Sequence, residues 1–448
     1  MGQDHADAAT ATSAVPPVAA RREADTQTDR SWVEARVWTA PMLAALESGV
    51  KGGRWYSLMD KVWALQTLQA AWERVQAANG AHGVDQMSVR RFGQNAEGYL
   101  RELSQALATG RYRPQPLRRV DIPKASGGQR PLGIPTVKDR VVQAALKLVI
   151  EPIFEREFEP TSWGFRPRRG CKDALREVDR HLKAGRTWVV DADVQACFDS
   201  IDHERLMRLV ERRISDGKVL ALLRLLLKQE VLQGLQCWTP AQGTPQGAVI
   251  SPLLANVFLH ELDVVMRERG HALVRYADDF VVLCDTQAQA DAALAHIRQW
   301  TDSVGLRLHP QKTRVGNCLL SGQGFEFLGY RFEAGRRDAR GKSQQALRDR
   351  VRLRTRRTSG QSLARIIEQL NPLLRGWFGY FKHGQARTLA TLDAFVRRRL
   401  RSILCKREGR SYVYHRSRYN HQRWPNAFFA EQGLFTMYQA WLQASQSR

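Results

Sequence analysis

The stretch Tyr276-Ala277-Asp278-Asp279 lies between two apolar runs, Leu273-Val274 and Phe280-Val281-Val282-Leu283. Strand-forming residues on both sides of a small acidic tetrapeptide predict a β-hairpin with two carboxylates at its tip. An Asp-Asp pair in a tight turn also has a purely local explanation, because Asp hydrogen-bonds its own backbone there. The hairpin alone therefore leaves catalysis and simple turn formation as alternatives.

A second predicted strand that ends in carboxylates favours catalysis. Trp188-Val189-Val190 leads directly into Asp191-Ala192-Asp193. Two or three carboxylates are enough to hold Mg²⁺, which prefers hard oxygen ligands and takes water and phosphate as its other ligands. Two such ions about 3.5–4 Å apart can activate an attacking hydroxyl and neutralise leaving oxygens. Because Asp193 and Asp278 are far apart in sequence, the pattern predicts a sheet that makes their strands neighbours.

The order of motifs along the chain resembles that of a reverse transcriptase of the group II intron type, an intron-encoded maturase. The resemblance covers nearly the whole chain after about residue 55. The motifs that carry it are Ile122-Pro123-Lys124, Arg130-Pro131-Leu132-Gly133-Ile134-Pro135, Gly164-Phe165-Arg166-Pro167, the Asp193 strand, Gly243-Thr244-Pro245-Gln246-Gly247, the Tyr276 to Asp279 hairpin, Gly305-Leu306 through Lys312, and Phe327-Leu328-Gly329-Tyr330.

The resemblance implies an α+β right-hand polymerase with fingers, a ferredoxin-like palm sheet and an all-helical thumb. Apolar spacing independently predicts helices from Asp60 to about Gly110, interrupted by a glycine-rich loop at 79–85. The expected domains are a disordered leader (1–54), an N-terminal extension and fingers (55–185), the palm with the catalytic carboxylates (186–335), a helical thumb or maturase domain (336–408) and a basic, aromatic, DNA-contacting tail (409–448).

For the catalytic centre the resemblance implies Asp193, Asp278, Asp279 and Lys312, the lysine as a proton donor to the departing pyrophosphate. Two Mg²⁺ ions would be held by Asp193, Val194, Asp278 and Asp279. Asp191 lies two residues before Asp193 and so on the same face of the strand, which makes it an alternative ligand.

Four residues are expected at the incoming deoxynucleoside triphosphate. Lys124 and Arg130 flank a glycine turn and could clamp the triphosphate, Lys as a point charge and Arg as a bidentate fork. Phe198 follows the first catalytic carboxylate at the spacing at which related polymerases exclude a 2′-hydroxyl, and the Gln246 amide could contact the nascent base pair. Surface salt bridges for the two cations and a core position for Phe198 are the alternatives.

Two further residues are assigned to the nucleic acid by resemblance. Arg166 lies in a segment that mixes aromatic and cationic side chains, as single-strand binding surfaces do, and is expected to contact the template. Gly329, in the Phe325 to Phe332 segment that alternates as one strand, is expected to let the primer end approach closely.

The charge of the chain points to a polyanionic partner. There are 69 Lys and Arg against 45 Asp and Glu, a net charge of +24, and each cation placed on a phosphate releases counterions. Residues 351–448 contain 19 basic and 4 acidic side chains interleaved with aromatic ones, a mixture that suits structured RNA. A solvated helix face is the alternative. The RNA-binding residues expected here are Arg375, Trp377, Lys382, Arg397 and Arg398.

Cysteines and targeting signals limit the class of protein. The six cysteines form no Cys-x-x-Cys pair, which argues against a zinc ribbon and fits a reducing cytoplasm. Without such pairs we expect no His-Asn-His endonuclease domain. No apolar run approaches the ~20 residues of a spanning helix, and the acidic N-terminal stretch is unlike a transit peptide. We therefore expect a bacterial, cytoplasmic protein with no membrane partner.

The resemblance implies an RNA-directed DNA polymerase, encoded by a group II intron, that binds the intron RNA to assist splicing and copies it into cDNA. Its partners would be the intron RNA, the DNA target and primer, and deoxynucleoside triphosphates. A splicing-only maturase and a reverse transcriptase used by the host in repair or phage defence are the alternatives.

Overall fold

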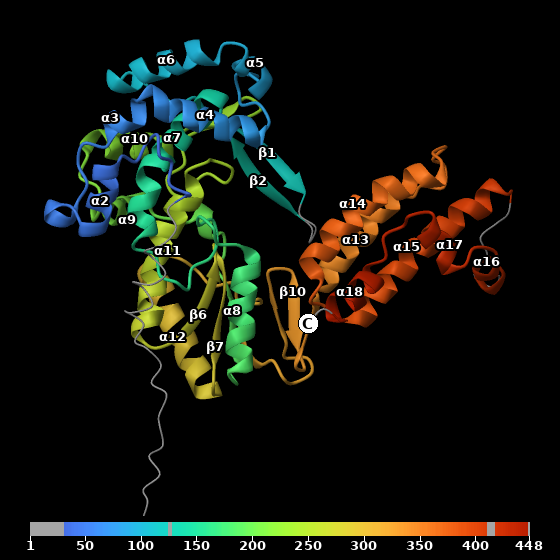
Figure 1. Ribbon diagram of the computed structural model, residues 1–448. Coiled ribbons are helices and arrows are strands. Elements are labelled where there is room, and N and C mark those ends of the chain that lie inside the picture. Colours follow the sequence, from blue (N-terminus) through green and yellow to red (C-terminus); the bar gives the residue numbers. More distant parts are fainter. Residues whose placement is uncertain (1–30, 124–127, 410–416, 447–448) are drawn as a thin grey trace, which may run out of the picture.

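The structure, a computed structural model, describes residues 31–123, 128–409 and 417–446. In Figure 1 the chain runs from a helical region drawn in blue, through a central sheet region in green and yellow, to a helical bundle in orange and red that stands to one side. This is the order of fingers, palm and thumb. The predicted α+β right-hand fold is therefore confirmed.

A group of helices covers the fingers at the N-terminal end. Leu68, Ala71 and Trp72 of the longest one are buried, as the helical spacing predicts, although Leu65 at its start is exposed. The helix is capped by Asn79, which adopts a left-handed φ of 43°. The prediction of helices between Asp60 and Gly110 is confirmed. The elements are α2 (Ala40–Ser48), the 3₁₀ helix η1 (Lys51–Gly53), α3 (Met59–Trp63), α4 (Leu65–Ala78), α5 (Val89–Gly93) and α6 (Ala96–Ala108).

Trp38 fixes part of the segment that was expected to be a disordered leader. The side chain is 2% exposed, and its indole N–H donates to the Leu148 carbonyl of α7 (Val137–Glu155) at 3.0 Å. The predicted leader boundary at residue 54 is therefore wrong for residues 31–54. Residues 1–30 lie outside the described residues.

The fingers contain a four-stranded sheet in the order β2-β1-β4-β5. The predicted hairpin is present, and its register pairs Ile122 with Arg130. Residues 124–127 lie outside the described residues, so Lys124 has no described position. A second hairpin, which the motifs did not predict, continues the sheet through a parallel pairing. The strands are β1 (Leu117–Pro123), β2 (Gln129–Ile134), β4 (Val231–Gln233) and β5 (Gln236–Trp238).

The palm is a four-stranded sheet in the order β6-β7-β3-β8 in which every neighbouring pair is antiparallel. The chain leaves β3, passes through helices to the edge strand β6, and returns through β7 between them. This is the predicted ferredoxin-like arrangement. The strands are β3 (Trp188–Asp193), β6 (Ala272–Tyr276), β7 (Asp279–Cys284) and β8 (Arg314–Asn317).

Each face of the palm sheet is covered by helices. Val190 and Phe280 belong to a core shared with α11 and α12, whereas Val189 and Val281 belong to a core shared with α8. The boundary expected at residue 185 is wrong, because α8 packs on the palm and not on the fingers. The palm elements are α8 (Cys171–Lys183), the 3₁₀ helix η2 (Cys197–Asp199), α9 (His203–Glu211), α10 (Gly217–Leu227), α11 (Ser251–Glu268) and α12 (Gln287–Ser303).

A small three-stranded sheet joins the palm to the thumb. The sequence predicted one strand over residues 325–332, but the structure has two strands there. They are joined by a tight turn in which Leu328 and Gly329 have φ values of 47° and 86°. The boundary expected at residue 335 divides this sheet and is also wrong. Its strands are β9 (Phe325–Phe327), β10 (Tyr330–Glu333) and β11 (Arg336–Ala339), in the order β11-β10-β9.

The thumb is a helical bundle that includes the C-terminal segment. Trp424, Phe429 and Met437 are buried in one apolar cluster with Ile366 and Leu400. The predicted separate tail is therefore wrong, because these later helices complete the core of the thumb. The helices are α13 (Gly341–Arg354), α14 (Leu363–Phe381), α15 (Ala386–Arg407), α16 (Ser417–Arg423), α17 (Asn426–Glu431) and α18 (Met437–Gln446).

Phe429→Ala tests whether the C-terminal helices stabilise the thumb. Phe429 is fully buried, and removing a buried Phe costs about 3–5 kcal/mol through lost transfer energy and the cavity left behind. We expect the urea-unfolding midpoint of the thumb transition to fall markedly. Leu442→Ala, at a side chain that is 38% exposed, is the matched control, and an equal effect of both variants would contradict the shared core.

Candidate active site

The hairpin of β6 and β7 carries two acidic residues at its tip. Tyr276 pairs with Asp279, so Ala277 and Asp278 form a two-residue loop. Ala277 adopts a φ of 59°, in the left-handed region that favours glycine. The hairpin predicted from the sequence is therefore confirmed, and its loop is conformationally strained at a non-glycine residue.

The register of the palm sheet brings the second acidic strand to the hairpin. Asp193 lies directly opposite Asp279 in the β3–β7 ladder. Residues directly opposite one another share a face of the sheet, so the two carboxylates lie on one face beside Asp278. The prediction that Asp193 and the hairpin meet is confirmed. Asp191 shares this face but forms an ion pair with Arg314 at 3.4 Å.

Burial and neighbouring charges raise the pKa of two of these carboxyl groups. Loss of hydration raises the pKa of Asp278, the charge of Asp193 adds to this, and Arg130 opposes it. Loss of hydration likewise raises the pKa of Asp279 to about 7, with the charges of Asp191 and Asp278 adding to the effect. Protein groups surround the Asp279 carboxyl group closely, although part of its surface is open to solvent. The site therefore concentrates negative charge, which the charge of Arg130 offsets only in part.

Lys312 is the nearest cation to the first carboxylate. Its Nζ lies 2.8 Å from Asp193 Oδ2, and both side chains are exposed. The preceding loop is held against the strand, because the His309 N–H donates to the Asp193 carbonyl at 2.8 Å. The structure thus brings Lys312 to the site, where a movable lysine partly neutralises Asp193.

The donor set suits a hard divalent cation. Asp193, Asp278 and Asp279 place three carboxylates at one end of the sheet, and Mg²⁺ needs only two or three protein carboxylates. The side chains do not form a closed cage, since no group of three His, Cys, Asp or Glu within the described ranges is gathered for a metal. Val194 and Leu308 form an isolated β-bridge, whose two backbone hydrogen bonds are made by Asp193 and Gln195 on the β3 side. The Val194 carbonyl accepts neither of these bonds.

Arg130 faces the carboxylates from the fingers. It is an exposed residue of β2, and its charge lowers the pKa of Asp278, in opposition to the burial that raises it. A cation on the fingers hairpin therefore lies close enough to influence the palm site.

Gln246 is engaged by an acidic neighbour. Its side-chain amide donates to Asp199 at 3.1 and 3.2 Å, and its backbone carbonyl accepts from the Gly133 N–H of β2 at 2.8 Å. The loop that contains Gln246 therefore ties the palm to the fingers. The amide must leave Asp199 before it can reach a base pair.

Phe198 lies between the predicted site and the core. The side chain is half-buried against the main apolar cluster, and its carbonyl accepts from the Thr244 N–H at 2.7 Å. Gly243 packs against the same segment, with a φ of 93° and an added Cβ only 2.8 Å from the Asp199 carbonyl oxygen. The ring thus has both a core contact and a free side.

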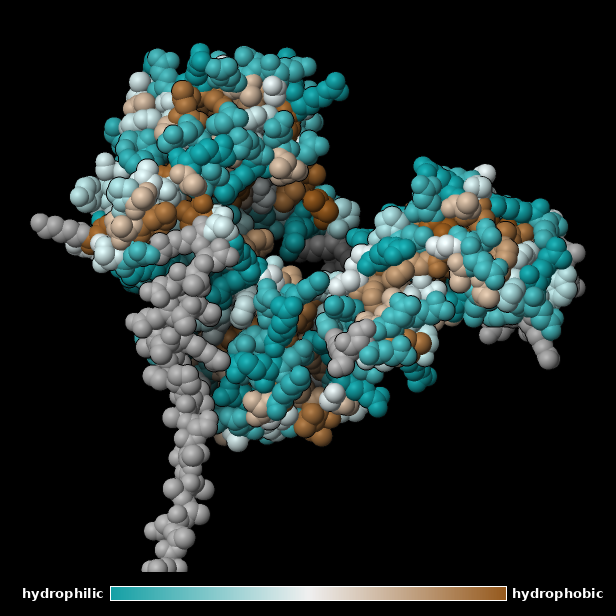
Figure 2. Space-filling model, viewed as in Figure 1, coloured by the Kyte–Doolittle hydropathy of each residue, from teal (hydrophilic) through white to brown (hydrophobic). Residues whose placement is uncertain are grey.

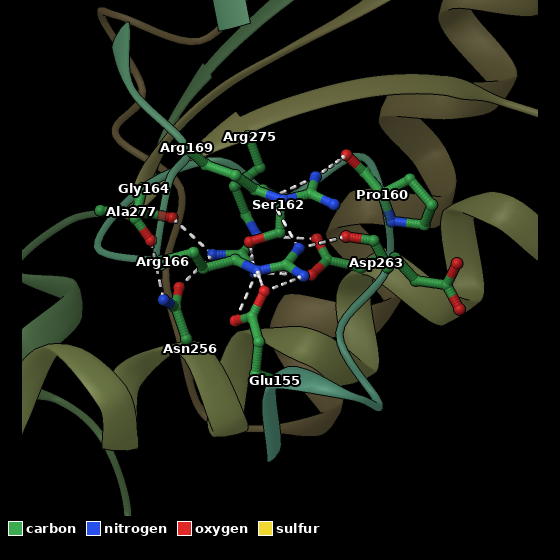
Figure 3. Close-up of polar contacts among 11 residues, drawn as sticks. Glu155, Pro160, Ser162, Gly164, Arg166, Arg169, Asn256, Asp263, Arg275 and Ala277 are labelled. Atoms are coloured by element: carbon green, nitrogen blue, oxygen red, sulfur yellow. Dashed lines mark hydrogen bonds and ion pairs between the residues drawn. The ribbon is translucent and has the colours of Figure 1, made fainter. Parts of the chain in front are cut away.

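Arg166, the predicted template contact, is buried. Its side chain is 3% exposed and forms hydrogen bonds with Glu155 at 2.7 to 3.0 Å. Further bonds reach the carbonyls of Glu159 and Ser162. The guanidinium points inward, as Figure 3 shows, and holds the 160–169 loop in place.

Sequence reasoning missed a buried arginine directly below the catalytic hairpin. Arg275 is fully buried and forms a two-point ion pair with Asp263 of α11 at 2.5 and 2.7 Å. It also donates to Ser162 Oγ at 2.8 Å, to Asn256 Oδ1 at 3.0 Å and to the Ala277 carbonyl at 2.9 Å (Figure 3). A charged residue inside an otherwise apolar strand was the available signal. Its role is to fix the loop that carries Asp278.

Gly329 lies in a turn that touches both the site and the thumb. The N–H of Leu328 bonds to the Asp279 carboxylate, and the Leu328 carbonyl accepts from the Tyr380 hydroxyl at 2.8 Å. Ser343 Oγ donates to the Gly329 carbonyl at 3.1 Å, and a Cβ added at Gly329 would lie 3.4 Å from the Phe381 ring. The turn thus connects the carboxylates with α14.

Three of the expected RNA-binding cations are exposed on the thumb. Arg375, Lys382 and Arg398 reach solvent, with Arg375 4.7 Å from the Phe435 ring centroid and Arg398 5.7 Å from that of Phe395. Aromatic rings therefore hold two of these guanidinium groups in place at the surface.

The other two expected RNA-binding residues face inward. Trp377 packs against Phe381, with ring centroids 4.5 Å apart, and joins the thumb core to that of the three-stranded sheet. Arg397 is half-buried, and burial lowers the pKa of its guanidinium. Trp377 is half-buried where two apolar clusters meet, so only part of its ring is open to the RNA contact that the sequence predicted.

Arg275→Met should destabilise the palm strongly. The change leaves Asp263 buried without its partner, and breaking a buried pair in this way costs about 3–5 kcal/mol. We expect a lower urea-unfolding midpoint than for Arg298→Met, on the exposed face of α12. The double change Arg275→Met with Asp263→Leu should recover much of the loss. Equal midpoints for the two single variants would contradict the role of the pair.

Asp279 should make stability depend on pH. Its pKa is about 7 in the folded chain and about 3.9 when unfolded, so the folded chain binds the extra proton between these values. The free energy of unfolding must therefore fall as pH rises through this window. In EDTA, we expect the unfolding midpoint of the natural chain to drop more between about pH 5 and pH 8 than that of Asp279→Asn. Asp291→Asn, an exposed position on α12, should behave like the natural chain.

Comparison with known proteins agrees with this fold. The family model described as reverse transcriptase (RNA-dependent DNA polymerase) matches residues 122–332, and the one described as group II intron, maturase-specific domain matches residues 344–424. Protein YkfC of Escherichia coli is 36% identical over 296 residues, which cover 57% of this chain and 77% of that protein.

Two intron proteins match shorter parts of the chain. The group II intron-encoded protein LtrA of Lactococcus lactis is 43% identical over 169 residues, or 38% of this chain and 28% of LtrA. An uncharacterized 91 kDa protein in a cob intron of Schizosaccharomyces pombe is 32% identical over 275 residues, or 48% of this chain and 34% of that protein. With the matching family models, the extent of the YkfC similarity shows that the chain belongs to the group II intron reverse transcriptase/maturase family.

Proposed function

We propose that the chain copies RNA into DNA by a two-metal mechanism and binds a group II intron RNA to assist its splicing. The observation that carries the proposal is the register that sets Asp193 opposite Asp279 and beside Asp278. Three carboxylates at one sheet end, with cations approaching from the fingers and from the β8 side, suit nucleotidyl transfer. None of the helices in the described ranges combines the length and apolar character that a bilayer crossing requires.

Two Mg²⁺ ions would be held by Asp193, Asp278, Asp279 and the Val194 carbonyl. When bound, they would lower the pKa of the primer 3′-hydroxyl and neutralise the leaving oxygens. The raised pKa values of Asp278 and Asp279, to which burial and neighbouring carboxylates contribute, support this assignment. Lys312, now on Asp193, would be free to protonate pyrophosphate once the carboxylate charge is otherwise neutralised.

The deoxynucleoside triphosphate would lie between fingers and palm. Arg130 would bind its phosphates, with Lys124 as the expected second cation of the same hairpin. Phe198 would close the pocket against a 2′-hydroxyl, and Gln246 would reach the base pair after leaving Asp199. The link from the Gln246 carbonyl to Gly133 supports this, because it couples the base-pair loop to the fingers.

The thumb would bind the intron RNA. Arg375, Lys382 and Arg398 are exposed on it, and residues 351–448 supply most of the net positive charge. Salt-dependent binding to phosphates is the expected consequence. We place the protein in the bacterial cytoplasm, where the intron RNA, its DNA target and primer would be available. A splicing-only role and a host repair or defence role are the competing functions.

The proposal is tested by incorporation of deoxynucleotides on a poly(rA) template with an oligo(dT) primer in Mg²⁺. We expect the natural chain and Asp291→Ala, on the exposed surface of α12, to extend the primer. Asp278→Ala should lower the rate by at least about a thousandfold, because a carboxylate ligand of the Mg²⁺ ions would be lost. Background incorporation by all three proteins would contradict polymerase activity and favour the splicing-only role.

A further inference from the structure

Phe165 is exposed in a strained backbone conformation close to the catalytic hairpin. Its side chain is 50% exposed, and its φ of 56° lies in the left-handed region, which is unusual for a bulky residue. Such strain persists only where the surroundings fix it, and it concentrates at functional sites. An exposed ring also gains little from burial, so fold stability does not explain this phenylalanine.

The neighbouring residues determine where Phe165 lies. Ser162 bridges in parallel to Arg275 on the edge strand β6, and the Trp163 N–H donates to the Arg275 carbonyl at 2.8 Å. The Gly164 carbonyl accepts from Asn256 Nδ2 at 2.8 Å. Figure 3 shows Gly164 and Arg166 on this network, at the side of Ala277. The residues around Phe165 are thus fixed to the palm.

Gly164 brings the loop into direct contact with the catalytic turn. A Cβ added there would lie only 2.3 Å from the Ala277 backbone nitrogen. No side chain fits between the two backbones, so the position of Phe165 is tied to that of Asp278, one residue further along the hairpin.

The ring of Phe165 lies on the carboxylate side of the sheet. Its centroid is 6.3 Å from that of Tyr276, at an interplanar angle of 44°. Tyr276 lies opposite Asp279, and Asp279 lies opposite Asp193. Directly opposed residues share a face of the sheet, so Tyr276, Asp279 and Asp193 lie on one face. The ring of Phe165 extends the surface that these three side chains form.

We infer that Phe165 is a nucleic-acid contact that stacks on a nucleotide of the primer–template beside the catalytic turn. A flat apolar ring that is rigidly placed and half-exposed suits a base or a ribose, and stacking of this kind is independent of sequence. Arg166, buried beneath, anchors the loop that presents the ring. The inference rests on the proposed polymerase function, because it assumes that a primer–template lies at the carboxylates.

The test compares Phe165→Gly, Phe165→Ala and Phe165→Trp for binding of a fluorescent oligo(dT) primer on poly(rA), measured by anisotropy, and for thermal unfolding. Loss of a stacked ring should raise the Kd about tenfold for the Ala and Gly variants, whereas Trp should keep the affinity. Gly relieves the left-handed strain, so Phe165→Gly should unfold at the same or a higher temperature while it binds more weakly. If the ring were only structural, its removal would lower both the affinity for the primer–template and the unfolding temperature.

Tyr56→Ala is the control, since this side chain is 68% exposed and follows Trp55, which bridges to Ile214 at the end of α9. Its Kd should match that of the natural chain. If the natural chain binds the primer–template and Phe165→Ala binds equally well, the inference fails and the polymerase proposal stands. If the natural chain neither binds nor extends the primer, the polymerase proposal fails and the inference fails with it.

Discussion

The antiparallel pairing of β3 with β7 is the interaction on which the rest of the site depends. It sets Asp193 opposite Asp279, and a slip of one residue would turn Asp193 toward the core that contains Val190 and Phe280. Both faces of the sheet are apolar and covered, one by α11 and α12 and the other by α8. A slipped register would bury polar groups on either face, so packing throughout the palm enforces the alignment of two carboxylates at its end.

The palm tolerates this concentration of negative charge because cations approach it from several directions. Lys312 contacts Asp193, Arg130 extends from the fingers, and Arg275 lies on the opposite face of the sheet, where its charge also opposes the rise in the pKa of Asp278. Of these three cations, Arg275 is the one that is fully buried, and the carboxylate of Asp263 balances its charge. Its contribution is therefore geometric as well as electrostatic, since one guanidinium joins α11, the 160–169 loop and the Ala277 carbonyl.

The sequence allowed the sheet, the acidic hairpin and the order of regions to be predicted, because each depends on local pattern or on motif order. Prediction from the sequence failed where the role of a residue depends on the direction in which its side chain points. Arg166 and Trp377 have the composition of a nucleic-acid surface. Arg166 lies in a loop, where no periodicity separates an inward from an outward side chain. Trp377 lies on α14 at helical spacing from the buried Leu370 and Leu374, a signal that composition alone did not use. The turn at Leu328 was missed because a leucine with positive φ has no sequence signal. Arg275 could have been found, since a charge in an apolar strand requires a buried partner.

The role of a single side chain also depends on its tertiary neighbours, which the sequence does not show. Phe198 keeps both its predicted and its alternative role, because the ring has a core contact and a free side. Lys124 and the first thirty residues lie outside the described residues, so predictions that fall on them stay predictions. Trp38, in contrast, could not be recognised from composition as the anchor of residues 31–54, since its partner is a backbone carbonyl far along the chain.

The thumb core has a consequence for how the protein is made. Its early helix contributes Ile366, but Phe429 and Met437 complete the cluster much later in the chain. During synthesis, domains fold as units from the N-terminal side, so the palm sheet can close once β8 has left the ribosome. The thumb, which is the most basic region, cannot complete its apolar core until residue 437 has emerged. The cations of the earlier thumb helices therefore leave the ribosome before the apolar cluster that they surround is complete.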